Sequence, residues 1–450
     1  MVCTAILRCA ALIAAGLSVP LASRGQAPAP HPVGRELPAF EAPGSPGAAL
    51  PEAPPEPTGV LRLEDALAAA LLRNPELAAD AYEARAREAA LLQAGAHPNP
   101  TLSLELEDVA GSGEFHGVES AQTTLLLGQL IELGGKRAAR LALAVADREL
   151  AAWDYELRRI DVLVRTADEF VDVLVAQKRL GLADEALELA RSMQRVASLR
   201  LRAGIASPAE EIRAGVEVDV ASVEREHSEH ELATVRQALA ATWAGEEPRF
   251  ERAEGDLERL PRVPSTEQIA QRLEASPNLA RWRRELARRD ALRSRATSDR
   301  IPDVHLSAGP RRLSGPDETA LVVGVTFPLP LWNRNRGAIA EAEYRVAKLA
   351  AEARASRVRT ATDLAAARIG LQASSEEAHL LSTRVLPGTE RAVEVMRRGY
   401  QQGRFAQIEV LEAERARLSA REQHLRALAE AHHSAQQIER LTGVPLEVLP

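Results

Sequence analysis

Two histidines in the stretch EREHSEHE are the residues whose type and spacing could bind a metal ion. His227 and His230 stand three residues apart, so a helix would place both on one face beside carboxylates. Zinc sites, however, use at least three good protein ligands. We favour a solvated charged face of a coiled coil as the interpretation of the same residues. His432 and His433 are adjacent and point in different directions on a helix. We therefore predict neither a metal site nor a bound cofactor, with His227 and His230 as the remaining candidates.

Catalytic and phosphate-binding motifs are weaker still. The stretch GGKR at 134–137 resembles the end of a phosphate-binding loop, but six residues separate Gly128 from Gly135, and Arg137 stands where Ser or Thr is required. No nucleophile–base pair is recognisable. The sequence therefore predicts that the protein is not an enzyme.

Composition indicates long helices and an exported chain. Of 450 residues only 3% are aromatic, while Ala, Leu, Glu and Arg are abundant. The net charge of −8 argues against a nucleic-acid partner, because phosphate binding needs a basic face. Residues 1–27 are typical of a signal peptide, with Arg8 before an apolar run. Both cysteines, Cys3 and Cys9, lie there, so we expect no disulfide in the exported chain. Residues 28–60 are rich in proline and predict a flexible tether, with ordered structure from about Leu61.

The remainder of the chain is duplicated. Pro75 and Pro277 occupy equivalent places in two similar helical stretches, Pro100 and Pro302 precede two β-like stretches, and RAGIASPAEE matches QQGRFAQIEV. The first repeat spans 61–264 and the second 265–443, followed by a tail at 444–450. Each repeat has the order helix, strand, loop, strand, long helix, tight turn, return helix.

Alternating residues predict two strands in each repeat, at 101–109 and 121–131, then at 303–311 and 319–328. Their length suits a tilted strand that crosses a bilayer, although a small water-soluble sheet half-covered by helices explains the alternation as well. Sheet edges cannot lie open in lipid, so four membrane strands would require several copies to close one barrel. The polar face would then line the lumen with Glu105, Glu107, Asp303 and His305.

Heptad spacing predicts helices far longer than a compact domain needs. Leu143, Leu150, Leu157, Val164 and Val171 recur at intervals of seven. An unbroken helix over 137–201 would reach about 100 Å, the length of a conduit across a periplasm.

Basic residues mark the points where strand gives way to helix in both repeats. Cationic side chains are well placed at a polar membrane interface, and glycine or asparagine permits the change of backbone direction. The cations are Lys136, Arg137, Arg334 and Arg336, and the permissive residues are Gly134, Gly135, Asn333 and Gly337.

At these residues the chain resembles the TolC family of outer-membrane efflux channels, in particular its cobalt–zinc–cadmium resistance (CzcC-type) branch. The motifs that carry the resemblance are QLIELGGKRAAR, FPLPLWNRNRGAIAEAE, RAGIASPAEE, RRGYQQGRFAQIEVLEAERARL and IERLTG. The resemblance implies a mainly α protein with a membrane β part: a homotrimer with an α-barrel tunnel joined to a 12-stranded β-barrel, four strands per protomer. It also implies a location in the outer membrane of a Gram-negative bacterium, extending into the periplasm, and partnership with a periplasmic adaptor and an inner-membrane RND pump.

By the same resemblance the turns at 202–208 and 398–408 are periplasmic tips that dock the adaptor. The tip residues are Arg202, Gly204, Ser207, Arg398 and Gly403. The expected function is a passive exit duct for divalent heavy-metal cations. The alternatives are the same channel exporting drugs or other small molecules, and a periplasmic coiled-coil adaptor, which would carry one hairpin and not two.

Overall fold

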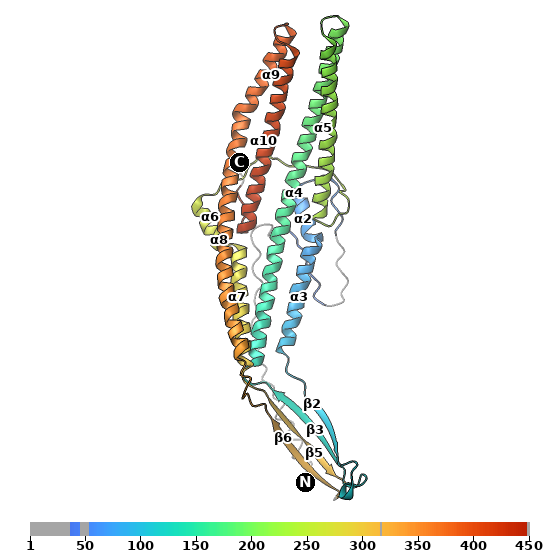
Figure 1. Cartoon of the computed structure of the whole chain (residues 1–450), viewed down its shortest axis with the longest axis vertical. Helices are drawn as coiled ribbons and strands as arrows, with labels where there is room; N and C mark the ends of the chain where they lie inside the picture. The colour runs from blue at the N-terminus through green and yellow to red at the C-terminus, as the bar shows by residue number, and fades with distance from the viewer. Residues whose placement is uncertain (1–36, 46–53, 316, 448–450) are drawn as a thin grey trace.

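The chain forms an elongated molecule with a helical stem at one end and a β-sheet at the other (Figure 1). The computed structural model describes residues 37–45 and 54–447, apart from residue 316. The expected signal peptide lies outside the described residues. Within the described part no helix is both long and apolar enough to cross a lipid bilayer.

The two repeats contribute similar elements in the same order. The first comprises β1 (Gly59–Leu61), α2 (Leu63–Arg73), α3 (Pro75–Gly95), β2 (Thr101–Glu107), η1 (Gly113–Phe115), β3 (Gln122–Ile131), α4 (Lys136–Arg202), α5 (Pro208–Ala241) and β4 (Phe250–Ala253). The second comprises α6 (Thr266–Glu274), α7 (Pro277–Ser298), β5 (Val304–Leu313), β6 (Glu318–Thr326), α8 (Arg336–Leu380), η2 (Leu381–Val385), α9 (Leu386–Gln401) and α10 (Gln407–Thr442).

Helix α4 is the axis of the stem. Its 67 residues pack against α2, α3, α5, α7 and α10, and at 1.5 Å per residue it extends for about 100 Å. The main core surrounds its middle, where Phe170 and Val173 join a cluster with the end of α5 and the middle of α10. Trp243 and Phe250 close this core with ring centroids 6.2 Å apart in an edge-on arrangement.

The second long helix is interrupted where the first is continuous. Between α8 and α9 the backbone forms one π-helical turn, η2, two residues before Pro387. Proline has no N–H for the helical hydrogen bond and its ring crowds the preceding turn. The hydroxyl of Thr383 donates to the carbonyl of His379, 2.6 Å away. A widened turn accommodates the proline without ending the helix.

The four long strands form one antiparallel sheet in the order β2-β3-β5-β6. Each repeat supplies a hairpin, and β3 joins β5 across the repeats, with Leu127 opposite Ala308 and Leu130 opposite His305. Strands β2 and β6 are the two edges, and among the residues that the structure describes their outer backbone groups have no strand partner. Sequence order alone does not determine this junction of the two hairpins.

The described part of the Pro-rich segment differs from the expected flexible tether. Leu37 and Ala39 pack against a buried cluster that includes Leu77, and the amide of Phe40 donates to the carbonyl of Leu71 at 3.1 Å. Residues 59–61 form β1, which pairs in parallel with β4. Apolar residues between the prolines give this segment enough contact surface to lie against the stem.

Candidate functional site

The sheet has one apolar and one polar face. The register places Leu102 opposite Leu127 and Leu104 opposite Leu125, and on β5 and β6 it pairs Leu306 with Val325. Cross-strand partners share a face, so leucine and valine cover one side of all four strands. Many of them are exposed in the single chain, Leu321 to 74%.

The opposite face carries charge. Glu105 lies opposite Thr124, and Glu107 lies opposite Gln122. Arg311 of β5 forms an ion pair with Glu107 at 3.0 Å, and its Nε donates to the hydroxyl of Thr124 at 2.9 Å. The acidic face expected from the sequence is therefore partly neutralised by an arginine. Arg311 continues the alternation of 303, 305 and 307 along β5, and this spacing could have revealed it.

Asp303 and His305 occupy different environments from each other. Asp303 precedes β5 and forms an ion pair with Lys136 at 2.8 Å, while one of its oxygens accepts the amide of Leu133. His305 lies within β5 with its Nε2 3.5 Å from the hydroxyl of Thr101. Of the predicted lumen residues, Asp303 thus belongs to the junction between sheet and stem, whereas His305 belongs to the polar face.

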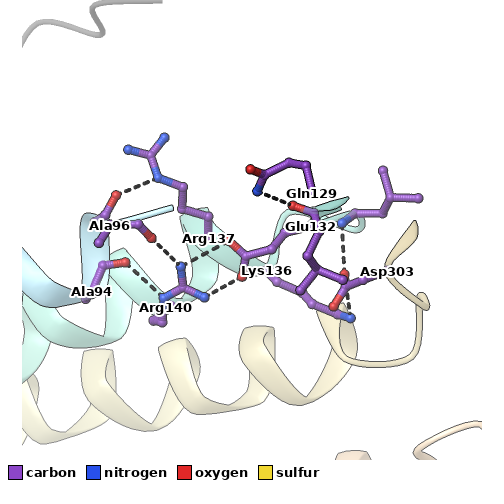
Figure 2. A network of polar contacts seen from close by, with 11 residues as sticks. Ala94, Ala96, Gln129, Glu132, Lys136, Arg137, Arg140 and Asp303 are labelled. Carbon is purple, nitrogen blue, oxygen red and sulfur yellow. Dashed lines mark hydrogen bonds and ion pairs between the residues drawn. The ribbon is translucent and has the colours of Figure 1, made fainter. Parts of the chain in front are cut away.

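The junction of the first repeat is a polar network (Figure 2). Arg140 forms an ion pair with Glu132 and donates to the carbonyls of Ala94 and Ala96. The Nε of Arg137 donates to the carbonyl of Gly95 at 2.8 Å. These bonds hold the end of α3 beside the start of α4, because they satisfy terminal carbonyls of a helix. Arg140 was not singled out in the sequence.

The backbone changes direction at left-handed residues in both repeats. Gly134 and Gly135 have φ angles of 68° and 73°. In the second repeat Asn335 adopts φ 55°, whereas neither Asn333 nor Gly337 is left-handed, so the sequence expectation was wrong by two residues there. Asn335 also donates from Nδ2 to the carbonyl of Ala296 at 2.7 Å. Asparagine tolerates the left-handed region better than other residues with side chains.

Arg334 and Arg336 are exposed beside this turn. The Nε of Arg334 donates to the carbonyl of Pro330 at 3.3 Å. Arg336 begins α8. The junction therefore carries charge on the surface of both repeats.

The two helical hairpins end in similar tips. Gly204 and Gly403 have φ angles of 70° and 71°, which glycine adopts at little cost. The hydroxyl of Ser207 accepts the amide of Glu210 at 3.4 Å and caps α5. Arg202 and Arg398 are exposed.

The tips touch through residues that the sequence did not single out. Nη1 of Arg200 donates to the hydroxyl of Tyr400 at 2.8 Å, and the guanidinium lies 5.5 Å from the ring centroid. A cavity of about 270 Å³ lies beside this pair, lined in part by Met193 and Phe405. The pair joins the first hairpin to the second.

His433, and not His227 or His230, has close side-chain partners in the described part of the chain. His227 and His230 are exposed on α5, and among the residues that the structure describes no group of three His, Cys, Asp or Glu side chains is arranged so that it could hold a metal ion. His433 instead binds α4: its Nδ1 and Nε2 lie 2.8 and 3.1 Å from carboxylate oxygens of Asp168 and Asp172. These two hydrogen bonds raise the pKa of His433 to about 10, so it is a cation at neutral pH. Burial lowers the pKa of its neighbour His432.

Solved outer-membrane channels share this fold. The outer membrane protein VceC of Vibrio cholerae superimposes with a TM-score of 0.70 over 86% of this chain and 97% of that chain, at 18% identity. The open MtrE channel of Neisseria gonorrhoeae superimposes with a TM-score of 0.71 over 85% of this chain and 89% of that chain, at 16% identity. The predicted fold class, a TolC-like mainly α protein with a membrane β part, is confirmed.

Sequence relatives define the family. The outer membrane efflux protein model matches residues 66–245 and 269–444. Cobalt-zinc-cadmium resistance protein CzcC of Cupriavidus metallidurans is 35% identical over 88% of this chain and 93% of that protein. Nickel and cobalt resistance protein CnrC of the same organism is 32% identical over 70% of this chain and 72% of that protein. The chain belongs to the outer membrane efflux protein family.

Family membership fixes the class of function. The protein is a passive channel of the Gram-negative outer membrane and not an enzyme. Channels of this family work with an adaptor and an RND pump in tripartite systems. The alternative of a periplasmic adaptor is therefore excluded.

Proposed function

We propose that three copies of this chain form one channel that releases divalent heavy-metal cations from the cell. The observation that carries the assembly is the open sheet with an apolar face. Its edges, β2 and β6, lack strand partners within the described part of one chain, and unpaired backbone groups in lipid are costly. Pairing β6 of one copy with β2 of the next would satisfy both edges and close a barrel of 12 strands.

In this assembly the apolar face meets lipid and the polar face lines the lumen. Glu105, Glu107 and His305 would then border the path of the cargo, with Arg311 balancing Glu107. The ion pair between Lys136 and Asp303 would lie at the point where the barrel continues into the helical tunnel. An acidic lining favours cations through its field without holding them tightly, as a conduit requires.

The cargo is inferred from the relatives. CzcC is named as a resistance protein for cobalt, zinc and cadmium, and CnrC as one for nickel and cobalt. This chain covers most of both.

The helical tips would receive the periplasmic adaptor, because they form the end of the stem farthest from the sheet (Figure 1). The tip residues are Arg202, Gly204, Ser207, Arg398 and Gly403. The inner-membrane RND pump would supply the driving force.

The test is tolerance to metals in a strain that lacks the gene. Deletion should lower the tolerated concentrations of zinc, cadmium and cobalt several-fold and leave tolerance to hydrophobic drugs unchanged, and the wild-type gene should restore growth. Unchanged metal tolerance with lost drug tolerance would contradict the metal cargo.

Substitutions at the tips sharpen the test. Gly204→Val and Gly403→Val place a branched side chain at a left-handed position and should reduce the restored tolerance while the trimer still forms. Gly388→Val is the matched control, because Gly388 lies in α9 with ordinary backbone angles and open space around it. Full restoration by both tip variants would contradict adaptor docking at the tips.

A further inference from the structure

Five arginines lie at the junction of stem and sheet. Among the described residues, none of their guanidinium groups forms an ion pair. Arg137 lies at the start of α4, two more lie in the last turn of α7 and just after it, and two flank the start of α8. The set, called the arginine belt, is Arg137, Arg295, Arg300, Arg334 and Arg336.

Arginines of α7 that lie farther from the sheet form ion pairs with carboxylates of α4. Arg288 pairs with Asp147 of α4, Arg284 pairs with Glu149 at 2.9 Å, and Arg281 pairs with Asp154. Among the described residues, the ion pairs of α7 end at Arg293, which pairs with Asp290, and residues 319–340 contain no acidic side chain. Unpaired positive charge therefore increases along α7 toward the strands.

One hydrogen bond and a shared pocket bring the α7 and α8 segments of the belt together. Asn335 bonds to the carbonyl of Ala296, which joins the start of α8 to the end of α7. A shallow pocket of about 330 Å³ beside this bond is lined by Arg295, Asn333 and Asp299. Asp299 is the acidic residue of this pocket, and Arg295 and Arg300 flank it in sequence, so the surroundings remain positive.

Large apolar side chains adjoin the belt on the side of the sheet. Trp332 is 92% exposed, and Leu329 and Leu331 are more than half exposed. Tryptophan is enriched at the level of lipid headgroups, and leucine favours the acyl region below it. Apolar residues next to unpaired cations are the arrangement that a lipid with a negative headgroup complements.

We infer that the arginine belt binds the phosphate headgroups of anionic phospholipids in the leaflet on the stem side of the membrane. This inference rests on the proposed channel, because it requires the sheet to lie in the bilayer. The guanidinium groups contact the phosphate through charge-assisted hydrogen bonds, while Trp332 rests among the headgroups and Leu331 contacts the acyl chains. The belt thus selects phosphatidylglycerol over the zwitterionic phosphatidylethanolamine.

Native mass spectrometry of the purified channel tests this selection. The full-length protein is incubated with equal amounts of phosphatidylglycerol and phosphatidylethanolamine with identical chains, and the retained lipids are counted. The wild type should retain phosphatidylglycerol in several-fold excess, since each basic residue near an anionic surface strengthens binding about five-fold. Arg295→Gln/Arg334→Gln/Arg336→Gln should bring the ratio close to one, and the exposed single variant Arg334→Gln should lower it part of the way.

The control variant removes the same charge elsewhere. Arg354→Gln/Arg359→Gln/Arg384→Gln replaces exposed arginines on α8 and η2, away from the strands, and should keep the wild-type ratio. Raising the salt to about 0.5 M should reduce the wild-type preference, because it screens exposed charge.

Conductance of the same samples across planar films of phosphatidylethanolamine separates the two proposals. A wild-type lipid ratio near one in a protein that conducts ions would contradict the lipid site but not the channel. A loss of lipid preference in the control variant equal to that in the belt variant would also contradict the lipid site. A protein that retains phosphatidylglycerol selectively and conducts ions supports both.

Discussion

The helical stem and the four-stranded sheet expose opposite kinds of side chain. The stem buries small and medium apolar residues along α4 and shows water a surface of ion pairs, such as Arg284 with Glu149. The sheet exposes Leu104 and Val323 and turns charged Glu107 to the other face. The surface of the stem therefore suits water, whereas the apolar face of the sheet suits lipid. Burial away from water stabilises the stem, whereas closure of backbone hydrogen bonds in lipid requires the sheet to find a partner.

The largest effect is expected in the core of the stem. Trp243→Ala removes a side chain that is 1% exposed and packs on Phe250. The free energy of unfolding should fall by about 3–5 kcal/mol. Thermal unfolding of the detergent-solubilised protein, followed by circular dichroism, measures it.

Trp332→Ala supplies the matched control at the junction, where the same residue type is exposed. It should change stability in detergent by less than about 1 kcal/mol. Equal losses from the two tryptophans would contradict the contrast between stem core and junction surface.

The two faces of the sheet should differ for substitutions at neighbouring positions. Leu104→Arg places a charge on the apolar face, which costs about 2–4 kcal/mol near the middle of a bilayer. Ser103→Arg places it on the polar face of the same strand, where the cost should be about 1 kcal/mol or less. Folding into lipid vesicles at increasing urea concentration measures both. A cost for Ser103→Arg that matches Leu104→Arg would show that the two faces meet the same solvent.

The link between α10 and α4 should depend on pH. The pKa of His433 is raised from its ordinary value of 6.5 to about 10 in the folded protein. Its contribution to stability is therefore complete below pH 6.5 and is lost as the pH rises toward 10. The side chain is about one third exposed, so we expect a loss of only about 1–2 kcal/mol.

Thermal unfolding of the wild type and of His433→Gln across this pH range tests the link. The variant should be less stable at pH 6.5, and the difference should shrink as the pH rises. A difference that stays constant between pH 6.5 and 10 would contradict the role of the charged imidazole.

The smallest effect is expected from a single ion pair on the surface of the stem. Arg284→Gln removes the pair with Glu149, whose side chains are partly exposed. Exposed pairs contribute about 0–1 kcal/mol. Chemical denaturation measures the change in the free energy of unfolding. A loss of several kcal/mol would indicate that the ion pairs of α7, and not its buried residues, hold this helix on α4.

Local patterns predicted much of the fold. Alternation located strands that the structure places at Thr101–Glu107 and Val304–Leu313, and heptad spacing indicated the length of α4. Such periods repeat within a few residues and depend little on the rest of the chain. The fold class and the family followed from the order of these elements and the motifs between them.

Long-range partners could not be predicted in the same way. The pairing of β3 with β5 joins separate repeats, and His433 meets Asp168 across 265 positions of sequence. No local period encodes either contact. Arg311 is a different case, since its place in the alternation was available and only its ion pair with Glu107 required the structure.

The most direct test of the channel is the conductance of purified full-length protein in planar lipid films, measured on a sample whose mass in detergent is determined in parallel. We predict a complex of three chains and stepwise ion currents that persist at low voltage. A monomer that dissolves in water without detergent and carries no current would contradict it.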